Sequence, residues 1–116
     1  MAKAALDQFT RNTSIELIAK GVRVNCVKPG IILTGFGESM GVDKTKSHAI
    51  VKMLATKPHC IPAGRVGEPE DIGNIIAFLA DRSASFYIVG QVITADGGST
   101  LVMGLRAQNI MELLKK

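Results

Sequence analysis

Residues 22–30 read Val-Arg-Val-Asn-Cys-Val-Lys-Pro-Gly. This short run is rich in β-branched residues, which favours a β-strand over a helix. Pro29 removes a backbone donor and Gly30 permits a turn, so we expect the strand to cover 22–28 and to end there. The fold class depends on the segments on either side of this strand.

The segment before the strand predicts an amphipathic helix over residues 4–20. Apolar residues recur at helical spacing from Leu6 to Ile18. Gly21 follows the last periodic residue, as expected of a left-handed C-terminal cap. The helix should therefore end there and lead into the strand.

The segment after the strand predicts a loop and then a short helix. Residues 31–43 contain three glycines, a density typical of a mobile loop. Residues 45–56 carry apolar side chains at helical spacing, and Pro58 and Pro62 close this segment on its C-terminal side. We therefore expect one helix between the loop and these prolines.

A further helix should begin at Pro69, a favoured first helical residue, with acidic residues in its first turn and an apolar stripe over 72–79. Residues 83–90 resemble a turn, and 91–95 a buried strand closed by Asp96-Gly97-Gly98. Residues 99–116 form either a last helix or a tail.

The order of helix, strand, helices and strand predicts an α/β crossover between two parallel strands. Two strands make a poor sheet, which indicates that further strands belong to the intact fold.

Composition excludes several function classes. The 116 residues, 47% of them hydrophobic, fit one domain, and the net charge of +4 comes from scattered lysines and arginines without a nucleic-acid-binding stripe. Cys26 and Cys60 are too few for a disulfide framework, which favours a reducing, cytoplasmic setting. No apolar run reaches the roughly 18 residues of a membrane span. His48 and His59 are expected at the surface, with no metal site.

Five motifs, in order, resemble the landmarks of the classical short-chain dehydrogenases/reductases. They are Lys3-Ala4-Ala5-Leu6, Asn25 to Gly30, Thr34, Gly64 to Ile72, and Gly90-Gln91 through Asp96-Gly97-Gly98. The match is specific because the motifs keep both sequence and spacing. The resemblance implies the C-terminal part of a Rossmann-like doubly wound parallel sheet over residues 1–104, with 105–116 as a tail or short helix.

The resemblance also implies roles for single residues. Lys3 matches the lysine of the Tyr-x-x-x-Lys motif, which lowers the pKa of the catalytic tyrosine and binds the nicotinamide ribose. That tyrosine would fall two places upstream of Met1, so the chain is expected to be truncated inside the motif. A solvated lysine is the alternative for Lys3.

The turn after the first strand resembles the nicotinamide loop of the family. Pro29 and Gly30 make the turn, backbone groups near Ile32 hold the carboxamide, and the Thr34 hydroxyl reaches the amide or the pyrophosphate. A strand-ending turn without a ligand is the alternative. The next loop and helix match the family's substrate-binding loop, in which Phe36, Met40 and Met53 line an apolar pocket or only pack.

Two functions remain open. The first is a fragment of an NAD(P)-dependent oxidoreductase acting on an alcohol or ketone, which we expect to be inactive alone because the catalytic tyrosine, the serine and the glycine-rich cofactor loop are absent. The second is a non-catalytic module that forms homo-oligomers or pairs with full-length relatives. The residue that separates NAD from NADP follows a strand that is not in the sequence.

Overall fold

The computed structural model describes residues 2–102, 104 and 112. The chain divides into two compact units, one of residues 1–28 and 70–94 and the other of residues 29–69 and 95–116. The elements are α1 (Ala2–Ile18), β1 (Cys26–Pro29), α2 (Phe36–Ser39), α3 (Lys44–Ala55), α4 (Pro69–Ala80), α5 (Arg82–Ser85), β2 (Val92–Ala95) and η1, a 3-10 turn (Ser99–Leu101). The expected order of helix, strand, helices and strand is therefore confirmed.

Helix α1 ends as the sequence predicts. Gly21 has a φ of 73°, and its N–H donates to the Ile18 carbonyl (2.9 Å) while the Val22 N–H donates to the Leu17 carbonyl (3.2 Å). This pair of bonds is the Schellman arrangement, in which a left-handed glycine reverses the chain. After this cap the chain runs on to β1, which begins at Cys26.

The buried face of α1 differs from the predicted apolar stripe. The side chains that are buried belong to Thr10 and Ser14, whereas Phe9 is 63% exposed and Ile15 is 75% exposed. Both hydroxyls are satisfied within the helix, by the carbonyls of Leu6 and Arg11. A β-carbon added to Gly90 would lie 2.5 Å from the Ser14 Oγ, so small residues on both sides allow this close packing.

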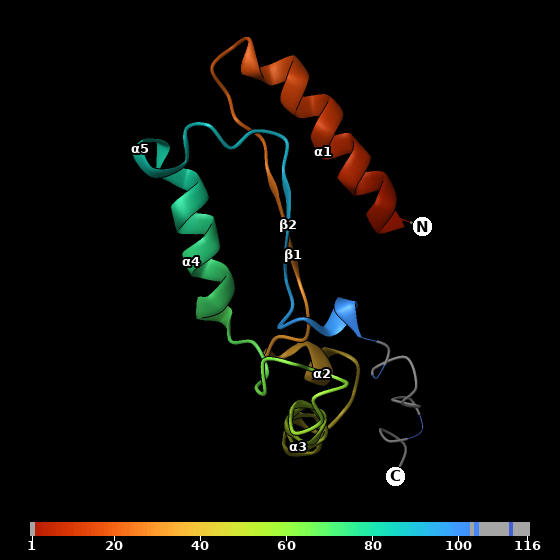
Figure 1. The fold of residues 1–116 in the computed structure, drawn as a ribbon. Helices are drawn as coiled ribbons and strands as arrows, with labels where there is room; N and C mark the ends of the chain where they lie inside the picture. The colour runs from red at the N-terminus through yellow and green to blue at the C-terminus, as the bar shows by residue number, and fades with distance from the viewer. Residues whose placement is uncertain (1, 103, 105–111, 113–116) are drawn as a thin grey trace. The chain divides into compact units, whose positions relative to one another are not determined.

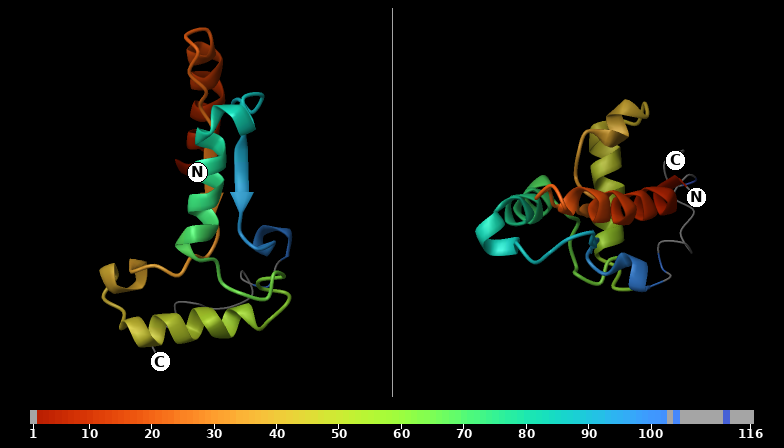
Figure 2. Two further views of the ribbon diagram at one scale, coloured as in Figure 1. Left: turned by 90° about the vertical axis from the view of Figure 1, so that its left-hand side faces the viewer. Right: turned by 90° about the horizontal axis from the view of Figure 1, so that it is seen from above.

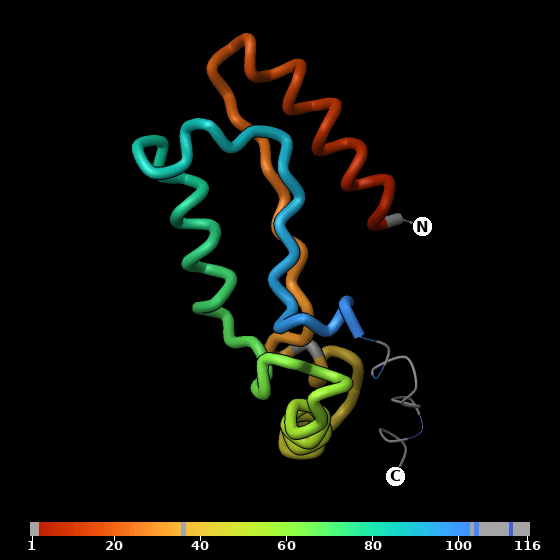
Figure 3. The backbone as a smooth tube through the Cα atoms, viewed as in Figure 1, coloured from red at the N-terminus to blue at the C-terminus, as the bar shows by residue number. Residues whose placement is uncertain are grey.

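Strands β1 and β2 form a two-stranded parallel sheet (Figure 3). Cys26 N–H donates to the Gln91 carbonyl and Gly30 N–H to the Ala95 carbonyl, so the pairing advances in the same direction on both strands. β1 begins later than predicted. The Gly90 N–H still donates to the Val24 carbonyl (2.8 Å), but at Asn25 the side chain interrupts the regular pairing, since it donates to the Ile88 carbonyl (3.0 Å) and accepts from the Gln91 N–H (2.9 Å).

In the unit of residues 1–28 and 70–94, α1 and α4 lie on opposite sides of the strands (Figures 1 and 2). This is the doubly wound arrangement expected of a Rossmann-like sheet. The apolar stripe of α4 is only partly covered, since none of its residues is buried and Ile76 remains 55% exposed.

The side chain of Arg23 ties the end of α4 to the following turn. Its guanidinium donates to the carbonyls of Leu79 (2.8 Å) and Ser85 (2.7 Å). The predicted turn after α4 contains a short helix, α5, because the Asp81 carboxylate accepts from the N–H groups of Ser83 and Ala84 and caps it. The Asp81 pKa is lowered mainly by the Ser83 hydrogen bonds.

The second unit has a small core, formed by the last residues of α3 and by the segment that follows it. Leu54, Ala55, Cys60, Ile61 and Val66 are buried there. Helix α3 begins where the Asp43 carboxylate accepts from the Lys46 N–H (3.1 Å), one residue before the predicted start. The glycine-rich loop before it contains a helical turn, α2, which contacts α3.

The expectation of a last helix or tail falls mainly on residues outside the described part of the chain. In residues 99–102 the structure shows only the 3-10 turn η1, which follows Gly98 in the left-handed conformation (φ 85°). Among the described residues no helix has the length and apolar character needed to cross a membrane.

Candidate functional site

The predicted nicotinamide loop begins at the end of β1, in the unit that contains α2 and α3. Pro29 closes the strand with an exposed side chain. Gly30 N–H donates to the Ala95 carbonyl (2.9 Å), and Gly30 packs against the backbone of Asp96. The turn is therefore held by the end of the neighbouring strand.

Ile32 pairs with Gly67 in an isolated parallel bridge. Leu33 N–H donates to the Gly67 carbonyl (2.8 Å), and Gly67 N–H donates to the Ile31 carbonyl (3.1 Å). Because a parallel bridge uses the groups that flank its central residue, the N–H and C=O of Ile32 take no part in it. The sequence analysis did not predict this contact. The one hint in the sequence is the glycine at position 67, because a β-carbon there would lie 2.5 Å from the Ile32 Cδ1.

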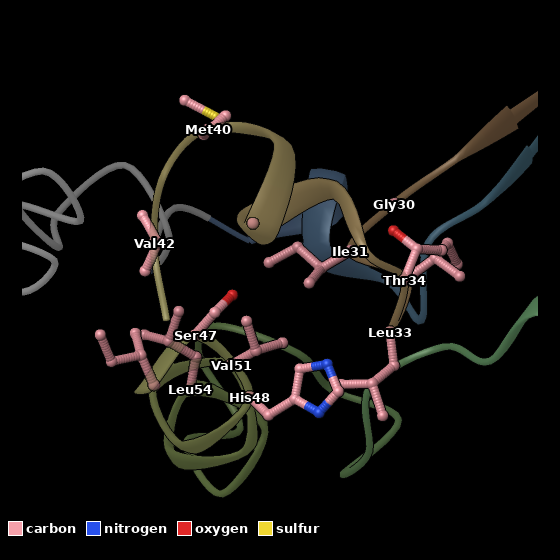
Figure 4. A pocket seen from close by; sticks show the side chains of 13 residues that line it. Gly30, Ile31, Leu33, Thr34, Met40, Val42, Ser47, His48, Val51 and Leu54 are labelled. Carbon is pink, nitrogen blue, oxygen red and sulfur yellow. The ribbon is translucent and has the colours of Figure 1, made fainter. Parts of the chain in front are cut away.

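A cavity of about 530 Å³ opens beside this loop, between residues 30–34 and α3 (Figure 4). Its lining residues are Gly30, Ile31, Ile32, Leu33, Thr34, Gly37, Met40, Val42, Ser47, His48, Ile50, Val51 and Leu54. Three of the four predicted loop residues, Gly30, Ile32 and Thr34, thus meet at one cavity, and Pro29 is not part of its wall. Parallel sheets bind ligands at the carboxyl ends of their strands, where this cavity lies.

The wall is apolar except for a few polar side chains. Thr34, Ser47 and His48 are the lining residues with polar side chains. His48 was expected at the surface, but it is half-buried, and its Nε2 is buried with no hydrogen-bond partner among the described residues. A buried polar atom in that state costs about 1 to 3 kcal/mol. His59 is exposed as expected.

Of the three residues predicted to line an apolar pocket, one is found in the cavity wall. Met40 lines the cavity, whereas Met53 is 39% exposed and lies outside the lining set. The Phe36 side chain lies outside the described part of the structure. Gly37 of α2 lies directly against Ser47 of α3, because a β-carbon added to Gly37 would collide with the Ser47 Oγ. These small residues keep the loop close to α3.

Asp96 shapes the turn that faces Gly30. Its carboxylate accepts from the N–H groups of Gly98 (2.9 Å) and Thr100 (2.9 Å) and from the Ser99 hydroxyl. The pKa of Asp96 is lowered by hydrogen bonds from Thr100, chiefly its side chain, and then from Gly98 and Ser99, while partial burial opposes the shift. These hydrogen bonds thus stabilise the Asp96-Gly97-Gly98 turn, against which Gly30 of the predicted nicotinamide loop packs.

Lys3 lies in the first turn of α1, with an exposed side chain, in the unit of residues 1–28 and 70–94. The cavity belongs wholly to the other unit. Tyr87, the sole tyrosine of the sequence, is 97% exposed. Among the described residues, no three histidine, cysteine or acidic side chains gather into a group able to hold a metal ion.

Comparison with known proteins gives a consistent result. A family model described as enoyl-(acyl carrier protein) reductase matches residues 1–100. A tropinone reductase homologue of Arabidopsis thaliana is 42% identical over 85% of this chain and 34% of its own length. The human dehydrogenase/reductase SDR family member 4 is 36% identical over 85% of this chain and 33% of its own length. The chain thus spans about a third of the length of the curated relatives it matches.

Solved structures agree with these relatives. A short-chain dehydrogenase/reductase of unknown function from Caenorhabditis elegans, crystallised with cofactor, is 54% identical, with a TM-score of 0.85, over 93% of this chain and 40% of its own. The L-sorbose reductase of Gluconobacter frateurii, complexed with NADPH and L-sorbose, is 31% identical, with a TM-score of 0.70, over 84% of this chain and 38% of its own.

Proposed function

Because this chain belongs to the short-chain dehydrogenase/reductase family, we propose that it provides the nicotinamide loop and the substrate wall of an NAD(P)-dependent oxidoreductase site for an alcohol or ketone. One observation carries the proposal: Gly30, Ile32 and Thr34 line a single cavity at the carboxyl end of a parallel strand. The relatives crystallised with cofactor or with NADPH and a sugar ketone support it.

The main chain of Ile32 suits a carboxamide. Its N–H and C=O take no part in the bridge to Gly67, and a carboxamide offers the complementary acceptor and donor. Thr34 adds a hydroxyl that reaches the amide or the pyrophosphate. Together they would fix which face of the nicotinamide ring meets the cavity, and the bound nicotinamide supplies the hydride.

Lys3 has a separate role in the proposal. Its ammonium would bind the nicotinamide ribose and lower the pKa of a catalytic tyrosine, so that the phenol exchanges its proton with the substrate oxygen near neutral pH. The only tyrosine of the sequence, Tyr87, is not followed by a lysine four residues later. We therefore expect no ketone reduction by this chain alone, because proton transfer lacks its donor.

Binding of half of the cofactor tests the proposal directly. We expect the amide NMR signals of residues 30–34 to shift with reduced nicotinamide mononucleotide, and NADPH to bind only a few-fold more tightly, because the phosphate cradle is absent from the sequence. Thr34→Val should weaken both ligands, whereas Thr45→Val, which alters an exposed residue of α3, should leave them unchanged.

Two results would contradict the proposal. Shifts confined to residues outside 30–34 would place the nicotinamide elsewhere. Much tighter binding of NADPH than of the mononucleotide would mean that the chain holds the pyrophosphate itself.

A second candidate function, pairing with another copy or with a full-length relative, is favoured by the surface of α1. Phe9 is 63% exposed and Ile15 is 75% exposed, so α1 offers large apolar side chains that a partner could cover. In this proposal α1 docks on a partner, and the chain has no catalytic task.

A further inference from the structure

We propose that His48 determines substrate choice at this site by binding a neutral oxygen of the substrate that is distinct from the reacting carbonyl. The inference rests on the proposed function, because it assigns the cavity beside Ile32 to the substrate. It identifies the preferred substrate class as apolar ketones or alcohols that carry a second hydroxyl or carbonyl group.

The position of His48 is fixed by the start of α3. Asp43 caps the helix through the Lys46 N–H, and His48 follows in the next turn, where it lines the same cavity as Leu33 and Thr34 (Figure 4). A short, capped helix therefore presents the imidazole to the space beside the nicotinamide loop.

The chemistry of the ring is incomplete without a ligand. The Nε2 atom is buried and has no partner among the described residues, although buried polar atoms in proteins are nearly always paired. The χ2 torsion of histidine is soft and roughly two-fold, and in the proposal the ring turns about it until a nitrogen faces the cavity. An oxygen in the cavity would then supply the missing partner.

The remaining wall decides which oxygen fits. The lining set contains no lysine or arginine, so a carboxylate or phosphate would enter without a counter-charge, at a large desolvation cost. Ile50, Val51 and Leu54 face the rest of the ligand with apolar surface. A neutral hydroxyl or carbonyl on an otherwise apolar molecule satisfies both conditions.

Two probes of similar shape test this inference without any nucleotide: 1,4-cyclohexanedione and the hydrocarbon 1,4-dimethylenecyclohexane, in which CH2 groups replace both oxygens. The sequence has two histidines, so the ring signals of a 15N-histidine-labelled chain are assigned with the His59→Phe variant. We expect the dione to bind about two- to tenfold more tightly than the hydrocarbon, the worth of one hydrogen bond. The dione should shift the His48 ring nitrogens and leave those of His59 unchanged.

The matched variants are His48→Phe and His59→Phe. The preference for the dione should fall to about one in His48→Phe and persist in His59→Phe, because His59 is exposed and outside the lining set. His48→Gln, which keeps a donor and an acceptor, should retain part of the preference. Equal binding of the two probes by the parent chain, or no binding, would overturn the inference, as would a preference that survives in His48→Phe.

The shift of the His48 nitrogens in the parent chain decides the matter even if His48→Phe does not fold. Failure of the proposed function is seen separately, as the absence of nicotinamide shifts at residues 30–34. A chain that binds the dione through His48 but ignores nicotinamide mononucleotide would refute the cofactor loop and keep the oxygen site.

Discussion

Gly30 and Asp96 pack so closely that a β-carbon added to Gly30 would lie 2.6 Å from the Cα of Asp96. The neighbouring hydrogen bond, from Gly30 N–H to the Ala95 carbonyl (2.9 Å), holds the two segments in this position. The Pro29-Gly30 turn and the Asp96-Gly97-Gly98 turn, more than sixty residues apart in sequence, therefore support each other next to Gly30, which lines the cavity.

Gly30→Ala should destabilise the chain by about 1 to 3 kcal/mol, the usual cost of overpacking, because the contact is with rigid backbone. Gly35→Ala is the matched control, since Gly35 has an ordinary φ of −70° and its nearest neighbour is the Glu38 carboxylate at 3.9 Å. Urea unfolding measures both. Equal stability of the two variants would show that the turns are not in contact in solution.

The Asp96 carboxylate should make stability depend on acid. Its pKa in the folded chain is lowered from the ordinary value of 3.8, so its contribution is complete above that pH and is lost as the pH falls through the lowered pKa. In Asp96→Asn the loss of unfolding free energy between pH 5 and pH 2 should be smaller than in the parent, as measured by denaturant unfolding.

Thr100→Val tests the same acid dependence without changing the Asp96 carboxylate. It removes the Thr100 hydroxyl, which lowers the Asp96 pKa most, and keeps the backbone N–H that donates to Asp96, so its acid dependence should lie between those of the parent and Asp96→Asn. An acid dependence in Asp96→Asn as steep as that of the parent would assign the effect to other carboxylates.

Arg23→Met should lower the free energy of unfolding by about 1.5 to 3 kcal/mol, because it removes charge-assisted hydrogen bonds to the carbonyls of Leu79 and Ser85. Arg82→Met is the control: Arg82 is exposed and donates one bond, to the Gly21 carbonyl, so its loss should be smaller. Thermal or urea unfolding ranks the two. A larger effect at Arg82 would contradict the role given to Arg23.

The pairing function predicts association through α1. Phe9→Glu and Ile15→Glu should each shift the chain toward monomer, because they place a charge on the exposed apolar surface of the helix. Thr45→Glu, on an exposed residue of α3, should have little effect. Sedimentation velocity at micromolar concentration measures the change. A parent chain that is already monomeric there would refute self-association through α1.

The helix boundaries that depend on residues close in sequence were predictable. Gly21 ends α1 and Pro69 begins α4, because a left-handed glycine and a first-turn proline act within one turn of their own position. The order of elements and the doubly wound arrangement followed from these boundaries and from the family resemblance.

Features that depend on distant partners were not predictable. The late start of β1 results from the Asn25 side chain bonding to residues 88 and 91, and the position of Ile32 results from Gly67. The burial of Thr10 and Ser14 in place of the apolar stripe of α1 reflects the close approach of Gly90. The partial burial of His48 likewise depends on residues 30–42, which line one cavity with α3 and which helical periodicity alone does not predict.

The bridge between Ile32 and Gly67 has a consequence for protein engineering. The strip of chain proposed to meet nicotinamide is anchored from outside the substrate wall, so the cavity-lining residues Met40, Val42 and His48 can be randomised in a library without changing that anchor. Gly67 is the boundary of that freedom, because its backbone holds residues 31 and 33 and its missing side chain leaves room for Ile32. Selectivity can thus be redesigned on one side of the bridge without disturbing the other.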